Sequence, residues 1–115
     1  MKVLNFASNN VNIDLVNRNK SCTVRLGDKS LKYIEGAIVW VTLGQKFARK
    51  RMLYMAMIDK VLVKPVNKLT EKERLGVNSD IKNWNDMCTF LKSMYQKESI
   101  LESDIVTVVY FSELY

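Results

Sequence analysis

The sequence of 115 residues lacks histidine altogether and contains only two cysteines, Cys22 and Cys88. Without histidine, every His-dependent catalytic triad is impossible, and two cysteines are too few for an ordinary structural zinc site. We therefore expect neither a bound metal nor another cofactor. In a reducing compartment both cysteines are expected as free thiols, although the sequence alone leaves a disulfide between them open.

The sequence also lacks an apolar run long enough to span a bilayer, and its first ten residues are too polar for a signal peptide. We therefore expect a cytoplasmic protein without a membrane partner. Hydrophobic residues make up 48% of the chain and charged residues 26%, which is typical of a soluble globular protein. This length corresponds to a single domain, spanning residues 1–115, with an ordinary hydrophobic core.

Charge is unevenly distributed along the chain. Residues 1–64 contain 12 Lys and Arg against 4 Asp and Glu, a net charge of +8. Residues 65–115 contain 6 against 8, a net charge of −2. This asymmetry predicts one positively charged face, as found in nucleic-acid binders. Solubility alone is the alternative explanation.

Short apolar segments separated by turn residues predict the order β-α-β-β-β-α-α-β. Strands are expected over residues 2–6, 21–26, 37–43, 52–66 and 104–111, with 52–66 either one long bent strand or two strands ended by Pro65. Helices are expected over residues 9–18, from the Thr70-x-x-Glu73 capping box onward, and over 83–95. In the last helix, the apolar stripe from Trp84 to Tyr95 is expected in the core. Together these elements favour an α+β fold, a small mixed β-barrel with flanking helices.

The strongest candidate site follows the first predicted helix. Cys22, Val24 and Leu26 alternate with polar residues, so Thr23 and Arg25 share the opposite face of one strand. Lys20 lies at the helix-to-strand junction and can fold over that face. A hydroxyl beside two cations suits a nucleophile or an anion-binding site. The alternative is the ordinary polar face of an antiparallel strand.

A second candidate is a basic hairpin loop between two strong strands. Four cations surround one aromatic residue, in the order Lys46, Phe47, Arg49, Lys50 and Arg51. Cations beside an aromatic ring suit phosphate contacts combined with base stacking, as in single-stranded RNA binding. A solvated hairpin tip is the alternative.

Several motifs occur in an order that resembles the ASCH domain, a PUA-like β-barrel group that includes small bacterial acetylcytidine amidohydrolases. They are Lys20-x-x-Thr23-x-Arg25, Tyr33-x-x-Gly36 before a Val-rich strand, Leu69-Thr70-Glu71-Lys72, the helix ending at Tyr95, and a closing Val-rich strand. The similarity covers roughly residues 10–112. It implies a PUA-like barrel that binds RNA or a modified nucleotide.

The resemblance also implies roles for individual residues. Lys20 and Thr23 match the catalytic Lys and Thr of the amidohydrolases, and Arg25 matches a ligand for a substrate oxygen or phosphate. The family's Glu falls on Val77 without gaps, whereas counting back from Tyr95 places it near Ser79 or Asp80. Asp80 is therefore the first candidate for the catalytic carboxylate, and Glu73 is the second.

Three functions follow as hypotheses. The leading one is an ASCH/PUA-like domain that binds RNA or a nucleotide in a basic cleft. The first alternative is an amidohydrolase in which Lys20 deprotonates Thr23, which attacks the acetyl amide, and Lys20 or Asp80 protonates the leaving amine. The second is a non-enzymatic domain that binds an unknown protein through an exposed strand edge.

Overall fold

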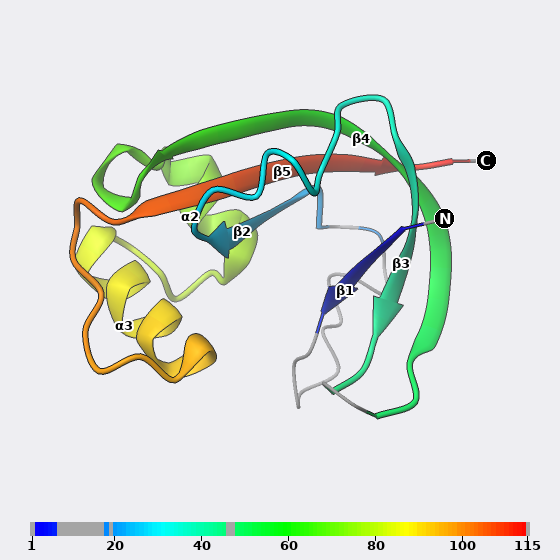
Figure 1. Ribbon diagram of the computed structural model, residues 1–115. Helices are drawn as coiled ribbons and strands as arrows, with labels where there is room; N and C mark the ends of the chain where they lie inside the picture. Colours follow the sequence, from blue (N-terminus) through cyan, green and yellow to red (C-terminus); the bar gives the residue numbers. More distant parts are fainter. Residues whose placement is uncertain (1, 7–17, 19, 46–47, 115) are drawn as a thin grey trace.

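The computed structural model describes residues 2–6, 18, 20–45 and 48–114, which form a five-stranded sheet with helices beside it (Figure 1). The strands are β1 (Val3–Phe6), β2 (Cys22–Leu26), β3 (Ile38–Leu43), β4 (Arg51–Pro65) and β5 (Ile105–Glu113). The helices are the 3-10 turn η1 (Val66–Lys68), α2 (Glu71–Val77) and α3 (Trp84–Tyr95). The helix predicted over residues 9–18 lies, apart from Arg18, outside the described residues.

Strand β4 is one long bent strand, the first of the two possibilities that the sequence allowed. Its fifteen residues would reach about 46 Å if straight, which exceeds the molecule's longest extent of 37 Å. Pairing shifts register against β3 between Val41 and Thr42, and against β5 between Ile58 and Lys60. An extra residue at each shift bends the strand. As a result β4 pairs first with β3 and then with β5 (Figure 1).

The sheet has the order β1-β3-β4-β5-β2, so β1 and β2 are its edges. It curls into a half-barrel, and within the described chain no ladder joins the two edges. The predicted α+β class is thus confirmed, but the expected barrel is not closed here. The edge strands are only four and five residues long. The side chains of Phe6 and Arg25 meet across the opening, with the Arg25 Cζ 4.9 Å from the ring centroid.

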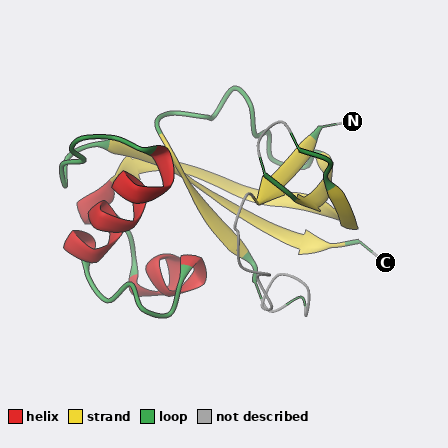
Figure 2. Cartoon of the chain, turned by 90° about the horizontal axis from the view of Figure 1, so that it is seen from below, coloured by secondary structure: helices red, strands yellow, loops and turns green. Residues whose placement is uncertain are grey.

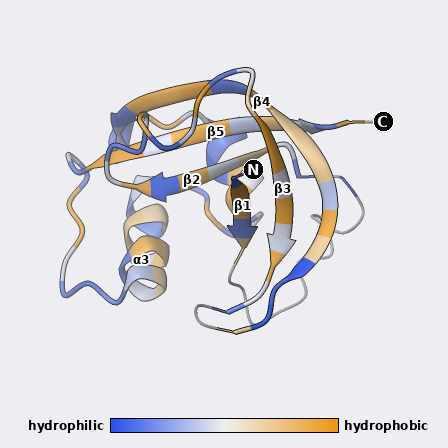
Figure 3. Cartoon of the chain, turned by 45° about the vertical axis from the view of Figure 1, so that its right-hand side comes forward, coloured by the Kyte–Doolittle hydropathy of each residue, from blue (hydrophilic) through white to orange (hydrophobic). Residues whose placement is uncertain are grey.

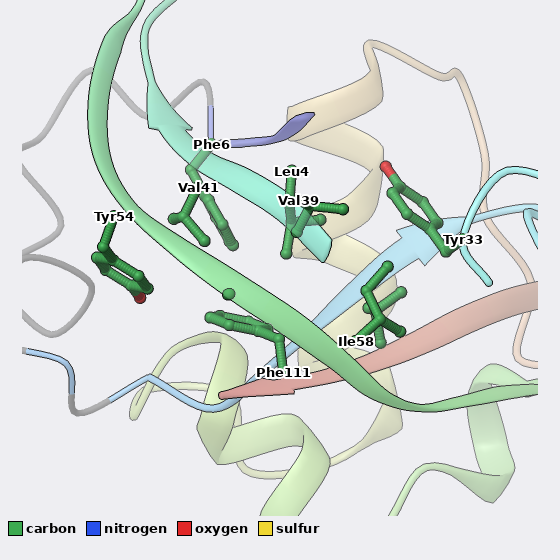
Figure 4. Close-up of a cluster of buried hydrophobic side chains, with 10 residues drawn as sticks. Leu4, Phe6, Tyr33, Val39, Val41, Tyr54, Ile58 and Phe111 are labelled. Atoms are coloured by element: carbon green, nitrogen blue, oxygen red, sulfur yellow. The ribbon is translucent and has the colours of Figure 1, made fainter. Parts of the chain in front are cut away.

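Two hydrophobic clusters lie on opposite faces of β5, because neighbouring side chains of a strand point to opposite faces. The half-barrel cluster fills the curled sheet (Figure 4) and consists of Leu4, Phe6, Tyr33, Val39, Val41, Tyr54, Ala56, Ile58, Val109 and Phe111. The helix cluster lies under the helices and consists of Cys22, Val24, Val66, Leu69, Ile81, Met87, Cys88, Leu91, Val106 and Val108. The alternation predicted for Cys22 and Val24 is therefore confirmed.

Helix α2 begins with the capping box that the sequence predicts. The Thr70 hydroxyl accepts from the Glu73 backbone N–H at 3.2 Å, and the Glu73 carboxylate accepts from the Thr70 N–H at 2.9 Å. These reciprocal bonds satisfy two N–H groups that a helix start otherwise leaves open.

Helix α3 packs on the sheet through Met87, Cys88 and Leu91, all buried. Trp84 was expected in the same stripe, but it is 43% exposed. It occupies the first position of the helix, one turn ahead of the buried residues, so its inclusion in the core was wrong. Figure 2 shows both α-helices beside one end of the sheet, opposite the end near the N and C labels.

Both cysteines are free and buried, and burial raises the pKa of each thiol above its ordinary value. The possible disulfide is therefore not formed.

None of the described helices is long and apolar enough to cross a membrane. Figure 3 shows hydrophobic residues along β3 and the middle of β4, whereas the start of β4 is hydrophilic.

Candidate functional site

A pocket of about 240 Å³ lies where β2 begins and β5 ends. Its position follows from strand pairing, because the Phe111 N–H donates to the Ser21 carbonyl at 2.9 Å and holds the start of β2 against the end of β5. Tyr54 of β4 completes one wall. The lining residues are Arg18, Lys20, Ser21, Tyr54, Phe111, Ser112 and Glu113.

Arg18 and Glu113 form an ion pair at this pocket. The Arg18 Nε donates to the Glu113 carboxylate at 3.3 Å, while its guanidinium carbon lies 4.5 Å from the centroid of the Tyr54 ring. A guanidinium over an aromatic face is attracted by the ring quadrupole. Burial raises the pKa of Tyr54, so its hydroxyl stays protonated and can donate a hydrogen bond to a ligand.

Lys20 joins the pocket to the end of α2. Its buried ammonium donates to the Gly76 carbonyl at 2.5 Å and to the Val77 carbonyl at 3.3 Å. A cation is favourable there because the last carbonyls of a helix carry partial negative charge. The Lys20 Nζ also lies 5.7 Å from the centroid of the Phe6 ring. Lys20 therefore has both a structural contact and a place in the pocket wall.

Thr23 and Arg25 project from the face of β2 opposite Cys22 and Val24. Thr23 is 6% exposed and pairs in register with Val109 of the half-barrel cluster. The Arg25 guanidinium lies over the Phe6 ring, and its Nη2 is buried without a hydrogen-bond partner in the described part of the chain. Phe6 in turn lies 6.1 Å from Phe111, measured between ring centroids.

These contacts make the site both positively charged and aromatic. Three cations, Arg18, Lys20 and Arg25, lie over two aromatic rings at the open side of the half-barrel. The Phe6 and Tyr54 rings both belong to the half-barrel cluster, which holds them in place. Because both rings are buried, this arrangement can attract an anionic group through its cations.

The basic segment is a hairpin connection, as predicted, because β3 and β4 pair antiparallel with Leu43 opposite Arg51. Arg49, Lys50 and Arg51 are exposed, and the Lys50 ammonium donates to the Gln45 carbonyl at 2.9 Å. Lys46 and Phe47 lie outside the described residues.

The hairpin leaves the sheet beside the pocket. The Gly44 N–H at its base donates to the Phe6 carbonyl at 3.1 Å, and Tyr54 follows Arg51 closely on β4. The basic side chains therefore begin at the same end of the half-barrel as the two rings.

The carboxylates predicted from the resemblance lie elsewhere. Asp80 is exposed in the turn after α2, where its backbone N–H donates to the Asn78 side chain at 2.9 Å. Among the described residues no hydrogen bond or ion pair links Asp80 to Lys20 or Thr23. At Val77, where the ungapped count places the carboxylate, the backbone carbonyl binds Lys20 instead.

Glu73, the second candidate carboxylate, is buried in a structural network. It accepts from the Lys64 ammonium at 2.9 Å and from the Tyr110 hydroxyl at 2.8 Å, besides the Thr70 N–H. Burial raises the pKa of Glu73, but these three donors outweigh it and hold the pKa below its ordinary value. Glu73 therefore binds α2 to β4 and β5 as an ionised carboxylate.

Sequence reasoning missed Arg18, Tyr54 and Glu113 in the pocket. Tyr54 shares its face of β4 with Ala56 and Ile58, and this alternation is the signal that could have placed it inward. Glu113 lies beyond the predicted end of the last strand.

No group of three or more His, Cys, Asp or Glu able to hold a metal occurs in the described ranges.

No protein-family model matches the sequence, and no curated protein matches it. Among solved structures, the chain is similar to protein EF3133 from Enterococcus faecalis V583, a family-model DUF984 protein. The TM-score is 0.62 at 18% sequence identity, and the match covers 89% of this chain and 68% of that one. At this identity the likeness concerns the fold alone.

Proposed function

We propose that this protein binds RNA or a nucleotide at the open side of its half-barrel, as an ASCH/PUA-like domain whose sheet is incompletely closed. The observation that carries the proposal is the placement of Arg18, Lys20 and Arg25 over the Phe6 and Tyr54 rings beside the pocket. Cations combined with aromatic faces are the usual equipment for binding phosphates and bases together.

The size of the pocket limits what it can enclose. Its volume of about 240 Å³ is below the roughly 300–1,000 Å³ of pockets for drug-sized ligands. It therefore suits one base or another small part of a nucleotide, with the remainder of the ligand outside. The Tyr54 hydroxyl and the Glu113 carboxylate offer a donor and an acceptor to the edge of a base.

The basic hairpin extends the binding surface beyond the pocket. Arg49, Lys50 and Arg51 are exposed and begin beside Phe6, so an RNA strand leaving the pocket in that direction meets three cations. The acidic remainder of the chain, residues 65–115, supplies the helices and also β5, whose Glu113 lines the pocket.

The test is a salt titration of binding to a short single-stranded RNA. Each phosphate contact contributes about 0.7 to the slope of log K against log salt. Replacing Arg49, Lys50 and Arg51 with Gln should therefore flatten the slope by roughly two units. The matched control replaces Lys82, Lys92 and Lys97 with Gln, which removes equal charge from the helical side. Equal slopes for the two triple variants would show that the hairpin does not contact phosphate.

A second proposal, deacylation of acetylcytidine, is favoured by one observation: Lys20 is buried and lines the pocket. In that mechanism Thr23 is the nucleophile and Lys20 is the base, and Lys20 then protonates the leaving amine, because Asp80 lies in the turn after α2. Acetate release from acetylcytidine at high protein concentration tests it directly. Binding of the nucleoside without acetate release supports the first proposal and excludes the second.

A further inference from the structure

The second half of β4 has one side that no strand covers in the described chain. Strand β3 pairs with β4 only as far as Met57, and the Ile58 N–H then donates to the Ala37 carbonyl at 2.9 Å. Residues 60–65 of β4 pair with β5 on their other side. Figure 1 shows this part of β4 along the upper margin of the molecule. The side of residues 61–65 that faces away from β5 is therefore an open edge, in addition to the edge strands β1 and β2.

The backbone of the open edge has one N–H donor without an acceptor in the described chain. In an antiparallel pair, every second residue directs its N–H and C=O groups to the partner strand. The Val61 N–H points away from β5, because it donates to the Glu35 carboxylate at 2.9 Å. Val63 has the same orientation as Val61, and no described residue accepts from its N–H. Val63 is also 42% exposed, which leaves room for a binding partner.

The pattern of backbone groups at the open edge matches an extended chain. The Glu35 carboxylate accepts from Val61 as the carbonyl of a neighbouring strand would. Next along the edge come the Val61 carbonyl, the open Val63 N–H and the Val63 carbonyl. Pro65 has no N–H and ends the row of donors. An added peptide strand therefore finds one donor between two acceptors.

The side chains beside the open edge indicate the chemistry of the partner. On one face of β4, Lys60 lies opposite Tyr110, and the Lys72 ammonium lies 5.6 Å from the centroid of the same ring. Both lysines are exposed, and neither forms an ion pair in the described chain. The other face presents Val63. Acidic side chains on one face of an added strand and apolar side chains on the other complement this edge.

We propose that the open edge binds an acidic extended peptide of a partner protein, which joins the sheet as a further strand beside β4. A second copy of this chain is the less favourable occupant, because each copy carries a net charge of +6. The open edge shares no residue with the pocket. The proposal therefore does not depend on nucleotide binding.

The first test measures amide hydrogen exchange of the ¹⁵N-labelled protein with and without a short peptide of alternating Glu and Val, blocked at both ends. In the free protein the Leu62 and Lys64 amides should exchange slowly and the Val63 amide fast. The peptide should slow exchange at Val63 and shift its resonance until saturation. A Val63 amide that is protected in the free protein, or that the peptide does not affect, overturns the proposal. Protection that appears only as protein concentration rises assigns the edge to a second copy and also overturns it.

The second test separates backbone pairing from charge attraction. Val63→Pro removes the open N–H, and an edge strand tolerates proline where the N–H faces solvent. The Kd of the peptide should rise about 5-fold, the effect of one lost hydrogen bond, and an unchanged Kd overturns the proposal. The exchange measurement on the unmodified protein decides the question even if Val63→Pro does not fold.

Replacing both Lys60 and Lys72 with Gln should raise the Kd of the peptide by roughly 4-fold, the effect of two exposed ion pairs. The matched control replaces Lys92 and Lys97 with Gln and should leave the Kd unchanged. Equal effects of the two double variants, or equal binding of a peptide of alternating Lys and Val, would show that the edge does not select an acidic strand and would overturn the proposal.

Discussion

Replacing Gly76 with alanine tests how closely α2 approaches β2. An ideal Cβ on Gly76 would lie 2.5 Å from the Cys22 Sγ, and Cys22 is 1% exposed, so the sulfur has little room to move. Alanine in place of glycine favours a helix by about 1 kcal/mol, whereas overpacking a core costs about 1–3 kcal/mol. We therefore expect Gly76→Ala to lower the free energy of unfolding by about 1 kcal/mol, where helix propensity alone predicts an increase.

The same contact controls the candidate site, because the Gly76 carbonyl accepts a hydrogen bond from Lys20. Cys22→Ala removes the sulfur, so the added methyl group of Gly76→Ala fits in that background. The double variant should be more stable than the sum of the single effects predicts, by about 1–2 kcal/mol. The gain in helix propensity from Gly76→Ala is the same in the wild-type background and in the Cys22→Ala background. A difference between the two backgrounds therefore reports the steric contact with the sulfur and not helix propensity.

The assay is urea denaturation of the wild type, the two single variants and the double variant. Unchanged m-values would show that the variants differ in stability and not in the compactness of the unfolded state. A Gly76→Ala protein more stable than wild type, with no coupling to Cys22→Ala, would refute the close approach of helix and strand.

Two further substitutions test buried polar groups by the same denaturation assay. Glu73→Gln removes the charge that pairs with Lys64 and should cost roughly 3 kcal/mol at pH 7. Because the folded pKa of Glu73 lies below its ordinary value of 4.5, its charge stabilises the fold above about pH 4.5, and this contribution is lost as pH falls through the folded pKa. The variant should therefore lose less stability between pH 5 and pH 3 than wild type, and parallel pH profiles would contradict this role. Thr107→Val removes a hydroxyl that donates to the Gly27 carbonyl and accepts from the Lys29 N–H, both at 2.7 Å, and should cost about 2 kcal/mol; a loss below about 0.5 kcal/mol would show that water replaces both bonds.

The local elements of the fold could be predicted from the sequence because their signals are local. Alternation placed Cys22 and Val24 in the core, and the Thr70 to Glu73 spacing predicted the capping box. The same kind of reasoning failed for Trp84, since helical spacing shows which residues share a stripe and not how far along the helix the packing extends. The length of β4 was visible, but its bends at two register shifts depend on pairing with two different strands.

The sequence by itself determined which residues carry charge, that histidine chemistry is absent, and that Thr23 and Arg25 share one face of a strand. The tertiary structure alone decided what those residues meet. Arg25 lies over Phe6 because the sheet curls until its edge strands face each other, and Lys20 binds the end of a helix more than fifty residues away in the chain. Arg18 and Glu113, 95 residues apart, pair beside Tyr54. Contacts at such separations depend on how the whole sheet closes, and no local pattern of residues records that closure.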